Sequence, residues 1–155
     1  AGIAQAMLND PKILILDEPT AGLDPNERIR FRNLISELSE ERLVLLSTHI
    51  VSDVEYIASE ILLMGEGKIL HQGTADELID SMPERVWKCR AEKSEVPALM
   101  KKYRGANIRS ETYGAELRII SGEKPSPDAV PEESALEDVF LYYFGEKGVD
   151  DSALI

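Results

Sequence analysis

Cysteine, positive charge and long apolar runs are all scarce in this chain of 155 residues. The single cysteine, Cys89, has no second cysteine with which to form an internal disulfide, and it suggests no metal site. Lys and Arg number 17 against 29 Asp and Glu, so the net charge is −12, which argues against a nucleic-acid-binding surface. No apolar run approaches the roughly 18–20 residues that cross a bilayer. We therefore expect a cytoplasmic protein that neither inserts into a membrane nor binds nucleic acid.

What the chain does have is the composition of an ordinary globular protein, 43% hydrophobic and 30% charged. Its length suits one domain, or a compact core with a small appendage. The first eight residues have helical apolar spacing, with Ile3, Ala4, Met7 and Leu8 on one stripe, but no N-cap residue precedes them. We therefore expect the chain to be a fragment of a longer protein.

Two short apolar runs end abruptly in polar residues, and they are the most informative feature of the sequence. Residues 13–16 read Ile-Leu-Ile-Leu and lead into Asp17 and Glu18, while residues 43–46 read Leu-Val-Leu-Leu and lead into Ser-Thr-His49. Apolar runs of this length are typical of strands buried on both faces of a parallel sheet. Because open parallel sheets bind ligands beyond the carboxyl ends of their strands, we expect Asp17, Glu18 and His49 to share one edge.

The segment between these runs has the signals of a helix that crosses from one strand to the other. Asp24 is a good N-cap, Pro25 suits the first helical position, and Glu27 completes a capping box. A second, shorter helix is expected over residues 50–58. This order predicts a right-handed crossover and a parallel pair of strands. The apolar residues that should pack on the sheet recur at helical spacing: Phe31, Leu34, Ile35 and Leu38.

A hairpin is expected next, with strands over residues 60–64 and 68–72 on either side of a Gly-Glu-Gly turn. His71, in the second of these strands, is expected to be solvent-exposed and inert. Residues 74–77 read as a capping box that opens a short helix. Pro83 then marks the expected boundary between two domains, which are residues 1–82 and residues 83–155.

The second domain is predicted to be a small α/β module. We expect strands over residues 86–91, 106–113 and 116–121, a helix over residues 96–103, and an exposed loop over residues 124–133. A last helix is expected to be capped by Ser134 and Glu137. Its apolar stripe consists of Leu136, Val139, Phe140, Tyr143 and Phe144.

Asp17 and Glu18 can take different tasks where the first strand enters a loop. Magnesium prefers oxygen ligands and keeps much of its hydration shell, so one carboxylate can hold the ion through a water. The other carboxylate can orient an attacking water or accept its proton. An acidic strand end without any chemistry is the alternative that these residues leave open.

Other groupings of polar residues carry weaker signals. Ser47, His49 and Asp17 could form a hydrolase triad, but the Gly-x-Ser-x-Gly elbow is absent from the sequence. His49 and Asp53 are too few to make a metal site. Asp24 has a clear structural role as a helix cap, which does not exclude a second role.

Taken together, these segments resemble the ATP-binding subunit of ABC transporters. Residues 13–18 look like the Walker B strand, residues 21–24 like the D-loop, and Thr48-His49 like the switch histidine. Residues 1–8 are similar to the helix that follows the signature sequence of the family. The order and spacing of all four segments agree, and the resemblance covers residues 1–80.

The resemblance implies a role for each residue at the expected edge. Asp17 serves a magnesium ion, Glu18 polarises the attacking water, and His49 contacts the γ-phosphate of ATP. Asp24 works across a dimer interface, near the nucleotide of the partner.

The resemblance also implies a partial P-loop NTPase-type parallel sheet with flanking helices, and the use of ATP and Mg²⁺ by the full-length protein. The implied partners are a second, identical ATPase subunit and the membrane-spanning permease subunits, which would hold the protein at the inner face of the cell membrane.

The chain also departs from the family's pattern. A Gly-x-x-x-x-Gly-Lys-Ser/Thr loop, whose amides would cradle phosphates, is absent, as are the Gln-bearing loop and the Leu-Ser-Gly-Gly signature. The nearest sequence, Gly65 to Lys68, is followed by Ile69 and falls in the expected hairpin. The chain thus resembles the C-terminal half of such a subunit, beginning just after the signature. We expect that it neither binds nor hydrolyses ATP on its own.

Exporters of this family often end in a small α/β module, so residues 83–155 favour an exporter. A non-transport ABC ATPase that acts on ribosomes or DNA is the alternative, and a binding module without catalysis is a third possibility. The resemblance implies that the membrane partners specify the transported substrate and the direction of transport.

Overall fold

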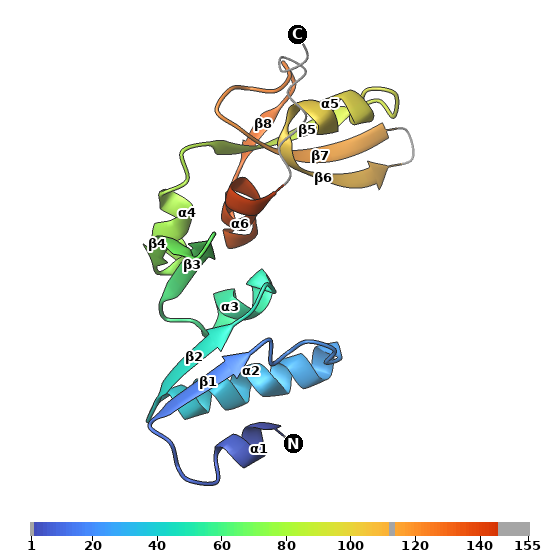
Figure 1. The fold of residues 1–155 in the computed structure, drawn as a ribbon. Helices are drawn as coiled ribbons and strands as arrows, with labels where there is room; N and C mark the ends of the chain where they lie inside the picture. The colour runs from blue at the N-terminus through green and yellow to red at the C-terminus, as the bar shows by residue number, and fades with distance from the viewer. Residues whose placement is uncertain (1, 112–113, 146–155) are drawn as a thin grey trace. The chain divides into compact units, whose positions relative to one another are not determined.

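The computed structural model describes residues 2–111 and 114–145, which form a mixed α/β structure (Figure 1). The chain divides into two compact units, Ala1–Ser59 and Glu60–Ile155. The first unit contains α1 (Gly2–Ala6), β1 (Ile13–Asp17), α2 (Pro25–Ser39), β2 (Leu43–Ser47) and α3 (Val51–Ile57). The second contains β3 (Ile61–Gly65), β4 (Lys68–Gly73), α4 (Ala75–Asp80), β5 (Arg85–Ala91), α5 (Val96–Lys102), β6 (Arg104–Glu111), β7 (Gly114–Ser121), β8 (Val130–Glu132) and α6 (Leu136–Phe144). The α/β class expected from the sequence is confirmed.

In the first unit, β1 and β2 pair in parallel as predicted, and α2 makes the connection between them. The register ends with Asp17 opposite Ser47. α2 begins where the sequence indicates, because the Asp24 side chain accepts a hydrogen bond from the Glu27 amide at 2.8 Å. The parallel register therefore brings the last residues of both strands to one edge.

One face of this strand pair is buried and the other is open. Leu14 and Leu16 are buried in one apolar cluster with Phe31 and Ile35 of α2. Within the described residues, helices cover only this face, so the expectation that both strands are buried on both faces is wrong for this chain. Burial instead alternates along each apolar run, as in half-buried strands. The side chains of the open face are 51–70% exposed, and they are Ile13, Ile15, Leu43 and Leu45.

Leu34 was expected to pack on the sheet, but it is 40% exposed. Leu8, which was expected on the apolar stripe of the first helix, is 79% exposed. Leu8 lies beyond the end of α1. On α2, Phe31 and Ile35 lie four residues apart and face the strands. Leu34 is turned by about 100° from Ile35 around the helix axis, which places it at the margin of that face.

The predicted hairpin is confirmed in the second unit, where β3 and β4 pair antiparallel. Glu66 and Gly67 connect them, with φ angles of 51° and 74°. Positive φ at both central residues is typical of the two-residue turn whose twist matches that of the flanking strands. α4 follows with the predicted capping box, in which the Thr74 hydroxyl accepts from the Glu77 amide and the Glu77 carboxylate accepts from the Thr74 amide.

The rest of the second unit is a four-stranded antiparallel sheet in the order β6-β7-β5-β8. Its core contains the buried residues Cys89, Leu117 and Ile119, and α5 packs against them through Val96 and Leu99. Burial raises the pKa of the Cys89 thiol, which keeps it in the unreactive neutral form.

Two expectations for the end of this unit are wrong. The expected loop over residues 124–133 contains β8, which pairs with β5, and its Pro131 is tolerated because β8 is an edge strand. The cap of α6 lies one residue later than expected. The Asp138 carboxylate, not that of Glu137, accepts a hydrogen bond from the backbone amide of Ala135 at 2.8 Å.

From its place in a surface strand, His71 was expected to be exposed and inert. In the structure it is half-buried and has a hydrogen-bond partner. Its Nε2 lies 2.5 Å from the phenolic oxygen of Tyr143 on α6, and the two rings are 5.0 Å apart. This hydrogen bond ties the β3–β4 hairpin to the last helix. Burial, and then the neighbouring Tyr142, raise the pKa of Tyr143, so its hydroxyl keeps its proton.

The predicted domain boundary between residues 82 and 83 stays a prediction. In the structure, residues 60–82 cluster with the residues that follow them. Among the described helices, none combines the length and the apolar character needed to cross a membrane.

The alternation of burial along β1 predicts that substitutions at two adjacent residues differ in their effect on stability. Leu14 is 2% exposed and Ile15 is 70% exposed. We expect Leu14→Ala to lower the free energy of unfolding by about 2–5 kcal/mol, because it leaves a cavity in the core. Ile15→Ala should change it by less than about 0.5 kcal/mol. Urea unfolding of the 155-residue chain, followed by circular dichroism, measures both values, and equal losses would contradict the one-sided packing.

Candidate active-site edge

The candidate site lies at the carboxyl ends of β1 and β2. Asp17 and Ser47 are the last residues of the two strands and lie opposite each other in the parallel register. The Ser47 hydroxyl donates a hydrogen bond to Oδ1 of Asp17. Both side chains are exposed, so the second carboxylate oxygen of Asp17 is accessible from solvent.

Glu18 leaves the strand in a left-handed backbone conformation, with φ at 44°. Few residues other than glycine adopt this region, and such conformations concentrate at functional sites. The Glu18 amide donates to the Ser47 carbonyl at 2.8 Å, which continues the pairing one residue beyond the strand. This conformation ends the regular strand geometry that β1 keeps up to Asp17.

The Glu18 carboxylate instead reaches the segment that follows β2. Its Oε1 accepts a hydrogen bond from the His49 amide at 3.1 Å and lies 2.7 Å from Nδ1 of the His49 ring. Its Oε2 accepts from the Thr48 hydroxyl at 3.2 Å. The structure therefore brings Glu18 and His49 into direct contact, as their expected positions at one edge implied.

The hydrogen bond from the His49 side chain lowers the pKa of Glu18 below the usual range of a glutamate. Partial burial acts in the opposite direction, and the Thr48 hydroxyl, the charge of His49 and the His49 amide lower the pKa further. The carboxylate is thus held in its charged form. A charged carboxylate that is partly open to solvent can orient a water and accept its proton.

Asp24 is engaged in a different way. Its carboxylate caps α2, and in the part of the chain that the structure describes it makes no hydrogen bond or ion pair with Asp17, Glu18 or His49. The turn before it contains Gly22 at a φ of 79°, with open space where a Cβ would stand. Asp24 therefore lies exposed at the start of α2, where its carboxylate caps the helix.

A magnesium ion fits this edge only if Asp17 binds it through a water. Among the described residues, no group of three or more His, Cys, Asp or Glu could hold a metal. Magnesium keeps several of its waters and is commonly bound by one or two carboxylates together with substrate phosphates. One exposed carboxylate, oriented by a serine hydroxyl, meets that requirement.

The two weaker groupings from the sequence do not form. Ser47 contacts Asp17 rather than His49, so the three residues do not line up as a hydrolase triad. Asp53 is 1% exposed and pairs with Arg32, so it cannot share a metal with His49. Sequence reasoning missed Thr48 and Arg32 as partners in this region; the run of hydroxyl residues before His49 was the available signal for Thr48.

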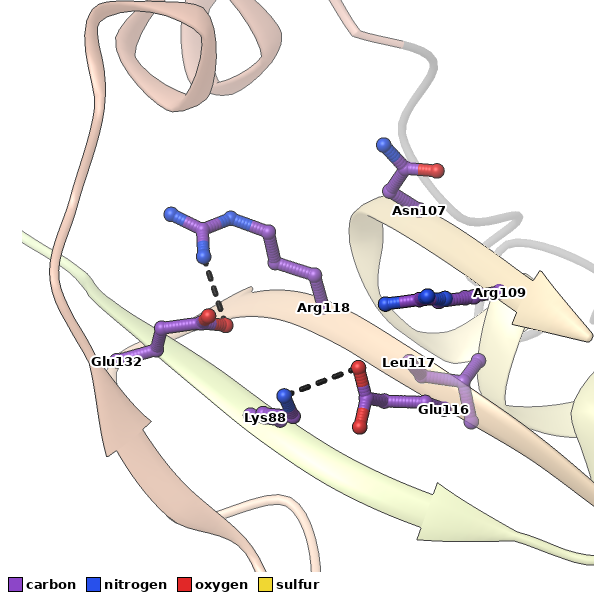
Figure 2. A pocket seen from close by; sticks show the side chains of 7 residues that line it. All are labelled: Lys88, Asn107, Arg109, Glu116, Leu117, Arg118 and Glu132. Carbon is purple, nitrogen blue, oxygen red and sulfur yellow. Dashed lines mark ion pairs between the residues drawn. The ribbon is translucent and has the colours of Figure 1, made fainter. Parts of the chain in front are cut away.

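A separate hollow of about 180 Å³ lies in the second unit, on the sheet of β5, β6 and β7 (Figure 2). Its ion pairs join Lys88 to Glu116 at 3.0 Å and Arg118 to Glu132 at 2.7 Å. A hydrogen bond to Asp138, above all, raises the pKa of Arg118, and this bond links the sheet to α6. Lys88 and Arg118 are thus paired with carboxylates of the same unit, and these ion pairs join β5, β7 and β8.

Comparison with known proteins places the chain in a family. No protein family model matches it. An uncharacterized ABC transporter ATP-binding protein of Bacillus subtilis is 33% identical over 144 residues, which are 91% of this chain and 45% of that protein. Another, of Synechocystis, is 30% identical over 159 residues, which are 97% of this chain and 45% of that protein. The chain belongs to the family of ABC transporter ATP-binding proteins.

The resemblance to ABC transporter ATP-binding subunits drawn from the sequence is thus confirmed. The Nod factor export ATP-binding protein I of Cupriavidus metallidurans is 40% identical over 80 residues, 51% of this chain and 26% of that protein. The chain spans less than half the length of these relatives. The roles of Asp17, Glu18, Asp24 and His49 stay predictions.

The contact between Glu18 and His49 leads us to expect a lowered pKa of Glu18 that depends on the His49 side chain. We expect an NMR titration of the Glu18 carboxyl carbon to give a pKa below the usual glutamate range, and His49→Ala to raise it towards that range. Since folding lowers this pKa, the charged carboxylate stabilises the fold above the pKa of the unfolded chain. That contribution is lost as the pH falls through the folded-state value. His71→Ala, the same change at the other histidine, is the control, and an unchanged Glu18 pKa in His49→Ala would contradict the contact.

Proposed function

We propose that this chain supplies the metal-binding and water-activating edge of the ATP site in an ATP-hydrolysing subunit of an ABC transporter. The observation that carries the proposal is the contact between Glu18 and His49 beyond the ends of two parallel strands, beside the exposed Asp17. Open parallel sheets bind ligands at this edge. Membership of the family supports ATP and Mg²⁺ as the ligands of the full-length protein.

Each residue at the edge is suited to a different part of the reaction. Asp17 would hold Mg²⁺ through a water, which leaves the ion free to neutralise phosphate charge. Glu18, held as a carboxylate, would orient the attacking water in line with the γ-phosphate and accept its proton. Little covalent chemistry is needed in phosphoryl transfer, so such positioning and charge supply most of the rate.

His49 is suited to contact the γ-phosphate with its second ring nitrogen. A carboxylate only accepts hydrogen bonds, so Nδ1 carries the proton in its contact with Glu18. The His49 side chain is 72% exposed, which leaves Nε2 accessible. To donate to a phosphate oxygen, Nε2 must carry a proton as well, so the imidazolium form is the one that would bind.

The intact subunit would work as one of a pair. ATP would close two identical subunits together, with Asp24 reaching towards the nucleotide of the partner, and hydrolysis would reopen them. Membrane-spanning permease subunits would convert this cycle into transport and hold the protein at the cytoplasmic face of the cell membrane. The relative named for Nod factor export supports export as the direction. A non-transport role on ribosomes or DNA has no comparable support, because the reported relatives are named as transporter or export subunits.

On its own, the 155-residue chain should not act as an ATPase. It contains no phosphate loop, whose backbone amides supply much of the affinity for the phosphates. We expect isothermal titration calorimetry with Mg-ATP to give no saturable binding at micromolar concentrations. Saturable micromolar binding would contradict the assignment of phosphate recognition to residues outside this chain.

The assignment of Glu18 is tested in the full-length subunit. We expect Glu18→Gln to lower kcat by at least about 10²-fold, because an amide cannot accept the proton, while the Kd for ATP stays within about twofold. Glu37→Gln, the same change at an exposed glutamate of α2, is the control and should keep wild-type turnover. Steady-state hydrolysis by Glu18→Gln at the wild-type rate would refute the role of Glu18 as general base.

A further inference from the structure

α3 begins two residues after His49 and has little of its own to hold it in place. It is seven residues long, and helices this short are not stable without tertiary contacts. Its N-cap residue, Ile50, provides no side-chain cap. The buried residue on this helix is not apolar but Asp53, which is 1% exposed. Ile57, the last residue of α3, packs against the apolar cluster of the first unit, and Asp53 anchors the helix near its start.

Asp53 contacts Arg32 of α2. The guanidinium donates a hydrogen bond from Nε to Oδ1 at 3.0 Å, and its Nη2 forms an ion pair with the same oxygen at 2.8 Å. The centre of the guanidinium also lies 4.7 Å from the centroid of the Tyr56 ring, one turn further along α3. Arg32 thus contacts two side chains of α3, Asp53 through an ion pair and Tyr56 through a cation–π contact.

This ion pair is a poor way to gain stability. Oδ2 of Asp53 is buried and has no hydrogen-bond partner among the described residues. Desolvating a carboxylate that is satisfied at one oxygen offsets much of the attraction to arginine, and apolar residues of similar volume often stabilise a fold as well or better. An ion pair differs from an apolar contact in being directional, because a planar guanidinium fixes both the distance and the angle of its partner.

The pair sits between the two segments that carry the proposed site. Arg32 lies two turns along α2 from Asp24, the residue that caps this helix. On the other side, Asp53 lies in the first turn of α3, four residues after His49. Between them, Thr48 accepts a hydrogen bond from the Ile50 amide at 3.0 Å while it donates to Glu18. A displacement of α3 would therefore be passed directly to the His49 ring and to its contact with Glu18.

We propose that the Arg32–Asp53 ion pair, braced by Tyr56, is a positioning element that fixes His49 against Glu18 by tying α3 to the helix that begins at Asp24. This inference rests on the proposed function, since it concerns the rate of the same hydrolysis. Arg32 and Asp53 act through His49 and do not touch the reacting atoms.

The test is a double-mutant cycle between Arg32 and His49 in the full-length subunit. Misplacing a catalytic group by about 1 Å costs on the order of 10–100-fold in rate, so Arg32→Ala should lower kcat by that factor. KM for ATP should stay within about twofold. In a His49→Ala background, Arg32→Ala should have no further effect on kcat, because the residue it positions is gone. Arg30→Ala, at an exposed arginine of the same helix, is the matched control and should keep wild-type kcat.

A spectroscopic readout keeps the test decisive where His49→Ala is too slow to assay. The ¹⁵N signals of the His49 ring should lose the signature of the hydrogen bond to Glu18 in Arg32→Ala, while Arg30→Ala leaves them unchanged. If Arg32→Ala does not fold, as judged by circular dichroism, Arg32→Lys replaces it, since lysine keeps the charge and loses the planar fork. It should lower kcat in the wild-type background and not in the His49→Ala background.

The outcomes separate this inference from the proposed function. Equal losses of kcat from Arg32→Ala with and without His49, or unchanged His49 signals, overturn the positioning role. The positioning role is also overturned if Arg32→Ala keeps wild-type kcat while Glu18→Gln is inactive. That result leaves the proposed function intact. Wild-type turnover in both Glu18→Gln and His49→Ala would instead overturn the proposed function itself.

Discussion

The parallel pairing of β1 with β2 is the constraint on which the candidate site depends. Its register sets Asp17 opposite Ser47, and the bond from the Glu18 amide to the Ser47 carbonyl carries the pairing one residue further. Two strands that are separated in sequence by the whole of α2 thus end at the same level. A slip of one residue would turn Asp17 to the other face and separate Glu18 from His49.

Glu18 departs from regular strand geometry, and that departure is what gives the edge its chemistry. In a continued strand, Asp17 and Glu18 would point to opposite faces. The backbone at Glu18 is left-handed, and three hydrogen bonds from Thr48 and His49 hold its carboxylate against the segment that follows β2. The same bonds lower its pKa, so one local arrangement both aims the carboxylate and keeps it charged. Backbone conformations of this kind are maintained by their surroundings, here by the segment after β2.

The sequence predicts what is encoded locally and misses what depends on distant contacts. The cap at Asp24, the parallel pair and the shared edge follow from turn chemistry and apolar patterning, and the structure has all three. The one-sided burial of β1 could not be predicted, because an apolar run reads the same whether or not a second layer covers it. The pairing of Arg32 with Asp53 joins residues 21 positions apart that no motif connects. The prediction for His71 was wrong for the same reason, since its partner Tyr143 lies 72 positions away in the sequence.

The central claim is that Asp17, Glu18 and His49 form the metal and water edge of an ATP site that the rest of the subunit completes. A structure of the full-length Glu18→Gln subunit with ATP and Mg²⁺ tests it most directly. We expect Mg²⁺ to be joined to Asp17 through a water and Nε2 of His49 to lie within about 3 Å of a γ-phosphate oxygen. The side-chain amide of residue 18 should face the γ-phosphorus across a water. A nucleotide bound with its γ-phosphate away from the carboxyl ends of β1 and β2 would contradict it.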